Sequence, residues 1–269
     1  MEYMNRTDEQ YFQQPPIIYI WQDRLLYLGK LSSDSRLYSG NVCLFGVSLH
    51  STVKIHERDS VTECSSFFIL PNTHHKIAYD KSDIIAWMLI EPAHSDCQKI
   101  KEKMRQQSDH CYTDIEGFDD VKKMLSTIYK QQPVSSIAHQ YLVNVLNFNE
   151  KSQYANDIKD MRILKIMQKI NQEIARNIPS SELANFVGLS NGRLQQLFKQ
   201  QAQMSIGQYR IWRRLKYAFE LSPNSSNFSE LAETSGFTDA AHFSRAFHTA
   251  FGKTASSMLG PANNLSFIQ

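Results

Sequence analysis

Amide and basic side chains are concentrated in one short stretch of the last third of the chain. Apolar residues recur between them at helical spacing, so the polar side chains would share the exposed face of one helix. Such side chains complement the hydrogen-bonding groups that base pairs present in the major groove of DNA. The polar residues are Asn191, Arg193, Gln195, Gln196 and Lys199.

This stretch belongs to a motif that occurs twice. The first copy, LANFVGLSNGRLQQLFKQQ, starts at Leu183, and the second, LAETSGFTDAAHFSRAFHTA, starts at Leu231. The copies align at an offset of 48 residues, and of 49 after the turn, where the second copy has one extra residue. Each copy has the pattern of a helix-turn-helix, and two such units could contact two successive major-groove faces of one duplex.

Each unit has the residues that a tight turn between two helices requires. In the first copy, a short helix over Ser181–Val187 would bury Leu183 and Ala184. Gly188 suits the left-handed conformation that ends such a helix, and Ser190 can cap the next one. One copy alone is equally compatible with an ordinary helical hairpin whose polar face is solvated. Two copies with matching turn and cap positions favour DNA binding.

A third helical pattern, over residues 204–221, joins the two units. One turn of DNA is ~34 Å long, so a helix of about this length would separate two units that enter adjacent major grooves. The same residues hold the densest basic cluster of the region. Its members are Arg210, Arg213, Arg214 and Lys216. Arg213 is predicted to contact phosphate, so its loss would weaken binding to all DNA sequences.

Length, composition and charge restrict the class of protein. The 269 residues favour two domains, and the hydrophobic content of 42% is enough for hydrophobic cores. Residues 151–269 hold 14 Lys and Arg against 8 Asp and Glu, whereas residues 1–150 hold 15 against 19. The C-terminal half therefore suits contact with phosphate, and the N-terminal half does not.

Targeting signals are not evident in the sequence. No apolar run approaches the ~20 residues of a membrane span, and the first residues lack the pattern of a signal peptide. The four cysteines have neither a CxxC pairing nor a zinc-like spacing. We therefore expect a cytoplasmic protein with reduced thiols and no membrane contact.

The N-terminal half has a different pattern. Residues 17–91 contain seven short runs rich in β-branched and aromatic residues, which predicts a small β-barrel or jelly roll. Amphipathic helices are predicted over 116–131 and 135–148. The expected fold class is α+β. A cupin-like barrel with flanking helices would occupy residues 1–150, and an all-α domain with two helix-turn-helix motifs joined by a long helix would occupy residues 155–269.

The N-terminal half also has candidates for a ligand site. Aromatic and imidazole side chains could line a pocket inside the barrel, although plain core packing is the simpler interpretation. The candidates are Trp21, Tyr27, Phe68, His75 and Trp87. His56 and Glu57 are adjacent on a predicted strand and so point to opposite faces, and the chain has no His-x-His. We expect no metal, no cofactor and no enzymatic activity, since no catalytic triad, phosphate loop or paired carboxylates is evident.

The C-terminal half resembles the AraC/XylS family of bacterial transcription regulators. The resemblance covers residues 160–260. It rests on LANFVGLS, on the run Leu197–Lys199, and on GFTDAAHFSRAF followed by FGKTASSM. Over residues 15–150 the resemblance is only architectural, since family members often carry a cupin-like ligand and dimerisation barrel followed by helices.

The resemblance implies base-facing positions in both units. The first recognition helix would be Asn191–Gln200 and the second Asp239–Thr249. In the first, the outward positions would be Gly192, Gln195 and Gln196, with Arg193 nearby. In the second, they would be Ala240, Ala241, Ser244 and Arg245. Because alanine offers only a methyl contact to thymine, we expect the first unit to supply most of the sequence discrimination.

Together these observations predict a sequence-specific transcription regulator that binds double-stranded DNA. We expect an activator that senses a small molecule at the barrel and forms a homodimer through its N-terminal domain. The resemblance implies RNA polymerase as a further partner. Two alternatives stay open. One is a ligand-independent DNA-binding protein whose barrel only dimerises, and the other is a cupin-type metalloenzyme with a helical appendage.

Overall fold

The N-terminal half is built from two β-sheets. A computed structural model describes residues 14–31, 40–57, 60–148, 158–225, 227–260 and 265–268. The strands are β1 (Ile17–Ile20), β2 (Arg24–Gly29), β3 (Cys43–Ser48), β4 (Val53–Glu57), β5 (Ser60–Cys64), β6 (Ser66–Ile69), β7 (Lys76–Ala78), β8 (Ile85–Ile90), β9 (Arg105–Gln106), β10 (Cys111–Thr113) and β11 (Ser266–Ile268). The larger sheet has the order β11-β1-β2-β8-β3-β6-β10-β9, and the smaller has the order β5-β4-β7.

The cupin-like pair of sheets is confirmed, and all seven predicted runs form strands. The barrel is not closed, however, because the larger sheet ends at β11 on one side and at β9 on the other within the described residues. Four strands, β5, β9, β10 and β11, were not predicted. They are short or polar, so they lack the run of alternating apolar residues by which a strand is identified.

Successive residues of the central strands point to opposite faces of the larger sheet. On β6, Phe67 lies in one buried cluster together with Tyr27 and Trp87, whereas Phe68 lies in the other cluster. Gly46 pairs with Phe67 across the strands, and a β-carbon on Gly46 would lie only 2.0 Å from the Phe67 ring. Glycine is therefore required at this position to admit the ring into the core.

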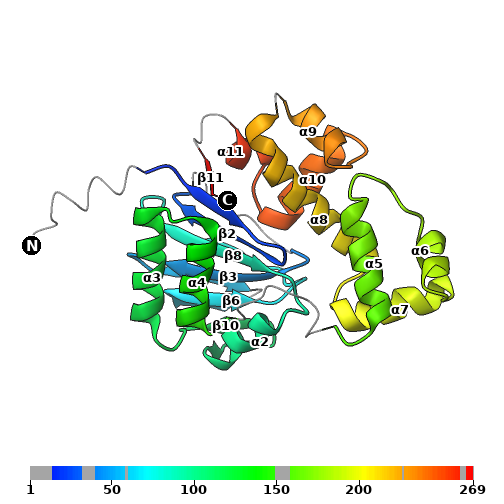
Figure 1. The fold of residues 1–269 in the computed structure, drawn as a ribbon. Coiled ribbons are helices and arrows are strands. Elements are labelled where there is room, and N and C mark those ends of the chain that lie inside the picture. The colour runs from blue at the N-terminus through cyan, green and yellow to red at the C-terminus, as the bar shows by residue number, and fades with distance from the viewer. Residues whose placement is uncertain are drawn as a thin grey trace, which may run out of the picture.

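Helices cover one face of the larger sheet. They are α3 (Phe118–Gln131) and α4 (Ser135–Leu146), with α2 (Ser95–Glu102) at its lower end (Figure 1). The two amphipathic helices predicted over 116–131 and 135–148 are thus confirmed, and both bury their apolar sides in the second cluster. The polar stretch 149–157, predicted as a linker, lies outside the described residues.

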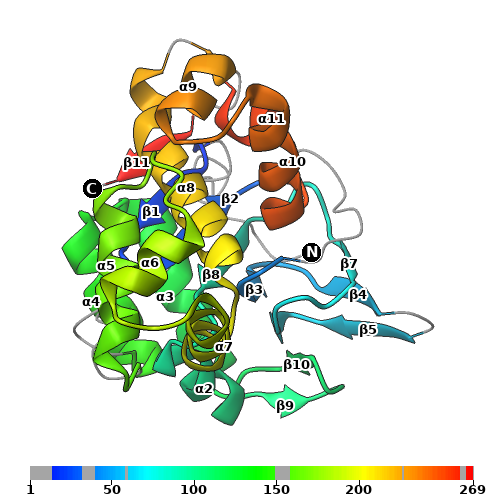
Figure 2. The same cartoon turned by 90° about the vertical axis from the view of Figure 1, so that its right-hand side faces the viewer.

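The C-terminal half is helical, as predicted. Its helices are α5 (Met161–Gln172), α6 (Ser180–Phe186), α7 (Asn191–Ala202), α8 (Ile206–Leu221), α9 (Phe228–Thr234), α10 (Ala240–Phe251) and α11 (Ala255–Leu259), with the short 3-10 helix η2 (Ser222–Asn224). The first helix-turn-helix is α6–α7 and the second is α9–α10. Figures 1 and 2 show that α8 runs between the two units. In the described parts of the chain, no helix is long and apolar enough to span a bilayer.

The last strand of the chain returns to the first. β11 pairs in parallel with β1, and the N–H of Ser266 donates to the carbonyl of Pro16 at 2.9 Å. Phe267 packs against the cluster that includes the C-terminal helices, and Ile268 packs against the cluster beneath α3 and α4. The C-terminal half is therefore joined to the N-terminal sheet by backbone hydrogen bonds as well as by side chains.

Candidate DNA-binding interface

Both helix-turn-helix units have the predicted turn. Gly188 and Gly236 follow the first helix of each unit with φ of 66° and 88°, in the left-handed region that favours glycine. The side chains of Ser190 and Asp239 accept hydrogen bonds from backbone N–H groups in the first turn of α7 and α10, at 3.3 Å and 2.6 Å. These caps define where each second helix begins.

The outward face of α7 carries most of the predicted polar residues. Its buried apolar residues are Leu194, Leu197, Phe198 and Ala202. Its exposed residues include Asn191, Gly192, Arg193, Gln196 and Lys199. Gln195 is half-buried, and its amide donates to the hydroxyl of Ser180 at 3.1 Å. Arg193 donates to Gln196 at 3.0 Å on the open face, so these two side chains lie together where DNA could meet them.

The outward face of α10 offers fewer hydrogen-bonding groups. The buried residues of α10 are Phe243, Phe247 and Phe251. Ala241, Ser244 and Arg245 are exposed, and Ala240 is half-buried. Arg245 also lines a cavity of about 170 Å³ together with Trp212 of α8 and Asn41, which precedes β3. One edge of the second recognition helix therefore lies next to the N-terminal half.

The basic residues of α8 contact protein groups rather than facing outward. Arg210 donates to the carbonyl of Ile178 at 2.9 Å, and Arg214 donates to the carbonyl of Ile174 at 3.0 Å. Lys216 donates to the carbonyls of Trp21 and Gln22 in the turn between β1 and β2. These hydrogen bonds join α8 to the segment before α6 and to the turn between β1 and β2.

Arg213 contacts the N-terminal half, which differs from the predicted contact with phosphate. It donates to the carbonyl of Gln22 and lies 3.8 Å from the carboxylate of Glu91, and its side chain is only 13% exposed. The predicted contact between Arg213 and phosphate is therefore wrong for this arrangement, because the guanidinium faces the N-terminal half. Helical periodicity placed Arg213 on a polar face of α8 but could not show that a second domain covers that face.

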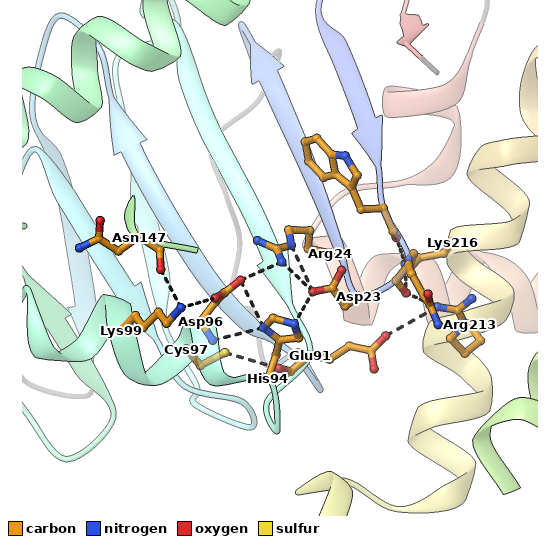
Figure 3. Close-up of polar contacts among 12 residues, drawn as sticks. Asp23, Arg24, Glu91, His94, Asp96, Cys97, Lys99, Asn147, Arg213 and Lys216 are labelled. Carbon is orange, nitrogen blue, oxygen red and sulfur yellow. Dashed lines mark hydrogen bonds and ion pairs between the residues drawn. The ribbon is translucent and has the colours of Figure 1, made fainter. Parts of the chain in front are cut away.

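Glu91 is the acidic partner of α8 at this contact (Figure 3). It follows β8 directly, is 2% exposed, and accepts a hydrogen bond from the indole N–H of Trp212 at 2.9 Å. Burial raises the pKa of Glu91 to about 7, although the charges of Arg213 and Lys216 oppose this shift. Burial likewise lowers the pKa of Lys216 to about 7. Two groups that titrate near neutral pH thus lie between the two halves.

A second buried network adjoins Glu91 and was not anticipated from the sequence. Arg24 Nη2 lies 2.9 Å from the carboxylate of Asp23 and 2.8 Å from that of Asp96, and His94 Nε2 lies 2.7 Å from Asp23 (Figure 3). Burial alone would raise the pKa of Asp23, but the hydrogen bond from His94 and the charge of Arg24 hold it well below its usual value.

The same network contains three residues of the types that bind metals. Asp23, His94 and Asp96 place one ligand atom each within 4.8 Å of one another. The guanidinium of Arg24 already bonds to both carboxylates, so a cation takes the central position without a metal. No spacing in the sequence indicated this cluster, because Asp23 and His94 come from distant turns that only the folded sheet brings together.

The match to a known protein family covers the two helix-turn-helix units. Residues 183–260 match a family model described as a helix-turn-helix domain. The Msm operon regulatory protein of Streptococcus mutans is 25% identical over 138 residues, which are 51% of this chain and 44% of that protein. The probable transcriptional regulator LumQ of Photobacterium leiognathi is 26% identical over 139 residues, which are 48% of this chain and 54% of that protein. The chain thus spans about half the length of these curated relatives.

Solved structures show the same overall fold. The crystal structure of ToxT from Vibrio cholerae O395 has a TM-score of 0.57 at 13% identity and covers 89% of this chain and 98% of that one. Wild-type ToxT from strain SCE256 bound to an unsaturated fatty acid has a TM-score of 0.53 at 13% identity, covering 89% and 95%. The helix-turn-helix model and the two regulators support the resemblance of residues 160–260 to the AraC/XylS family.

The candidate ligand residues do not share one pocket. Tyr27 and Trp87 lie in the cluster that faces the C-terminal helices. Phe68 and Trp21 pack in the other cluster, beneath α3 and α4, so the expectation of one common pocket is wrong. His75 is buried with Nδ1 2.8 Å from a backbone carbonyl, and burial lowers its pKa to about 4. Strand alternation sends these residues to opposite faces of the sheet.

Proposed function

We propose that this chain is an AraC/XylS-type transcription activator in which residues 155–269 bind DNA and residues 1–150 sense an effector. The observation that carries the proposal is the pair of capped second helices, α7 and α10, at the two ends of α8. α8 has 16 residues, which corresponds to a length of about 24 Å. Two recognition helices held apart in this way suit successive major grooves on one face of a duplex.

The base-reading residues proposed on α7 are Asn191, Gly192, Arg193, Gln195, Gln196 and Lys199, and those on α10 are Ala240, Ala241, Ser244 and Arg245. Gln195 would first have to leave Ser180, with which it shares a hydrogen bond. Gln196 and Arg193 are exposed, so they need no such rearrangement of the fold. The first unit therefore supplies most of the discrimination.

The contact between Glu91 and α8 gives the N-terminal half a means to control DNA binding. Trp212, Arg213 and Lys216 all contact the β1–β2 turn or Glu91. A ligand that moves these elements would move α8, and with it both units. Such control requires that the ligand bind with different affinity to the arrangements of α8 before and after this movement.

The proposed effector is an apolar carboxylic acid. Lys30 of the N-terminal half and Lys253 of the C-terminal half line one cavity of about 30 Å³, together with Tyr27 and Met258. That volume is comparable to one water molecule, so it would accept a carboxylate group. An apolar tail would displace side chains of the neighbouring core. The fatty acid bound to ToxT supports this ligand class.

A homodimer through α3 and α4 completes the proposal, with RNA polymerase as the partner in activation. Val134, just before α4, and Ile137 within it are 55% and 49% exposed. Exposed apolar residues on one helix favour burial against a second copy. Sedimentation of the full chain tests this assembly.

Selection of bound duplexes from random DNA by the full chain tests the function directly. The selection is run at a stated, near-physiological salt concentration, with and without oleate. We expect two short conserved blocks, spaced by one helical turn, in at least one of these conditions. No enrichment in either condition would contradict sequence-specific binding.

Thermal unfolding with oleate tests the effector class, and methyl oleate is the matched control because it lacks the carboxylate. A ligand that binds the folded state raises the midpoint by mass action. We expect a rise with the acid and not with the ester, and the rise should disappear in Lys253→Met. An equal rise with both compounds would show that the carboxylate is not recognised.

A further inference from the structure

The segment between α5 and α6 presents backbone carbonyls to the middle of α8. α5 ends at Gln172 and α6 begins at Ser180, so residues 174–178 belong to neither helix. Carbonyls released from helical hydrogen bonding require other donors when they are buried. Guanidinium groups supply such donors in a fixed planar arrangement.

Two arginines of α8, one turn apart, satisfy these carbonyls. Arg214 is buried, and its Nε and Nη2 donate to the carbonyls of Ile174 at 3.0 Å and Arg176 at 3.2 Å. Arg210 donates to the carbonyl of Ile178 at 2.9 Å. The segment that leads into the first helix-turn-helix is thereby fixed to α8.

The turn of the second helix-turn-helix meets the same segment. A β-carbon on Gly236 would lie 2.6 Å from the α-carbon of Ala175 and 2.9 Å from Nε of Arg214. Two features therefore favour glycine at position 236: its φ is 88°, and the backbone of the segment before α6 approaches it closely. The turn of the second unit is therefore in direct contact, beside α8, with the segment that leads into the first unit.

The segment also transmits its position to the first unit. Arg176 makes a two-pronged ion pair with Glu182 of α6, with distances of 2.9 Å and 2.8 Å. Arg176 also pairs with Glu173 at 2.7 Å. A continuous set of contacts thus runs from the turn of the second unit, through residues 174–178, to the first helix of the first unit.

We infer that Arg214 is the positioning residue of a joint that sets the rotation of the two recognition helices about α8, and hence the half-site spacing that the protein accepts. The inference rests on the proposed two-site mode of DNA binding. α8 alone sets the separation of the units, whereas a second contact beside its axis is needed to prevent rotation. Arg214, Arg210 and Gly236 supply that second contact.

Spacing of the half-sites is the property to measure. One base pair inserted between them moves the second half-site by ~3.4 Å along the axis and rotates it by about 34°. For the wild-type full chain, we expect the insertion to lower affinity about tenfold or more, since one unit loses its base contacts. In Arg214→Lys the loss should be severalfold smaller, because one ammonium cannot hold both carbonyls in the arrangement of a guanidinium.

A measurement without DNA tests the joint independently. Nitroxide labels are placed at the exposed positions Gln200→Cys of α7 and His248→Cys of α10, while the four native cysteines are buried. Electron–electron dipolar spectroscopy of the full chain then gives the distribution of distances between the two units. We expect a broader distribution in Arg214→Lys and in Arg210→Met than in the wild type or in the control Glu220→Gln.

The inference would be overturned if folded Arg214→Lys had the same distribution of label distances as the wild type. It would also be overturned if this variant lost as much DNA affinity as the wild type when one base pair is inserted between the half-sites. Circular dichroism establishes that each variant is folded, and Arg210→Met replaces Arg214→Lys if the latter is not. If the wild type selects no paired half-sites, the proposed function fails. The label distances still decide the joint in that case, so the two failures are distinguishable.

Discussion

Gln196 is the amide of α7 best placed to read a base. It is exposed, and its only hydrogen bond among those described comes from Arg193 on the same face. Gln195, by contrast, is half-buried against Ser180. An amide side chain can form two hydrogen bonds to adenine in the major groove.

Replacement of Gln196 by alanine should weaken binding to the selected site by about 1–3 kcal/mol and change binding to random DNA little. Gln200→Ala is the matched control, because Gln200 is an equally exposed glutamine at the far end of α7. Fluorescence anisotropy at one fixed salt concentration gives both affinities. Equal losses on selected and random DNA would show that the recognition face is assigned wrongly.

Glu91 is the residue whose charge state bears on the contact between the two halves. It is fully buried beside Trp212, Arg213 and Lys216. Burial raises its pKa from 4.5 to about 7. Because the pKa is higher in the folded state, the stability that protonated Glu91 contributes is complete below pH 4.5 and is lost as the pH rises through about 7. Lys216 behaves oppositely, since its lowered pKa costs stability as the pH falls from 10.5 toward 7.

Glu91→Gln should remove the cost of burying a carboxylate while keeping an acceptor for the indole of Trp212. Its free energy of unfolding relative to wild type should rise between pH 4.5 and 8, by at most about 3 kcal/mol. Denaturant titrations at several pH values measure this difference. The exposed Glu220→Gln serves as the control. A difference that does not vary with pH would mean that Glu91 does not titrate in this range.

At the scale of the element, the second recognition helix depends on its first turn. α10 is anchored by three phenylalanines along one side, but it begins with Ala240 and Ala241, which contribute no hydrogen bonds from their side chains. The carboxylate of Asp239 accepts from the N–H of His242 at 2.6 Å and so satisfies one of the free donors at the start of the helix. The N-terminal end of α10 is therefore held by the cap of Asp239.

Asp239→Ala should lower the free energy of unfolding by about 1 kcal/mol through loss of this cap. Asp239→Asn should retain most of the stability, because an amide oxygen accepts the same hydrogen bond. Chemical denaturation of the full chain measures both. If Asp239→Asn lowers the free energy of unfolding as much as Asp239→Ala does, then the negative charge near the start of the helix is the stabilising factor instead of the cap.

At the scale of the whole molecule, three of the contacts that hold the C-terminal half to the N-terminal half involve different elements. Trp212 of α8 bonds to Glu91, and Lys253, after α10, donates to the hydroxyl of Tyr79 at 2.6 Å. The third is the pairing of β11 with β1. Arg245 of α10 and Asn41 of the N-terminal half line one cavity, so we expect the access of DNA to α10 to depend on these contacts.

Phe267→Asp should weaken the pairing of β11 with β1, because a carboxylate would replace a half-buried ring. Hydrogen exchange at the amides of residues 17–19 should accelerate, and affinity for the selected DNA should rise. Ser266→Ala is the control, since it leaves the backbone hydrogen bonds of β11 in place. Unchanged exchange in Phe267→Asp would show that the strand does not depend on this side chain.

Residues 183–251 illustrate how far sequence alone determines this protein. The repeat, Gly188 and Gly236 at the turns, and the cap Ser190 were predicted and are confirmed, whereas Asp239, which was expected within the second recognition helix, is its cap. Each depends on interactions within a few residues, such as a positive φ or a hydrogen bond to the next turn, so the local sequence determines it. Seven strands of the N-terminal half and the helices α3 and α4 were identified from local patterns for the same reason.

Only the tertiary structure decided which partner each polar face meets. Arg213 and Arg214 are neighbours in the same basic cluster, yet one contacts Gln22 of the N-terminal half and the other the carbonyl of Ile174. The pairing of β11 with β1 joins segments from opposite ends of the chain. Periodicity specifies that a face is polar or apolar, but the surface that covers it comes from distant residues, and only the folded chain brings the two together.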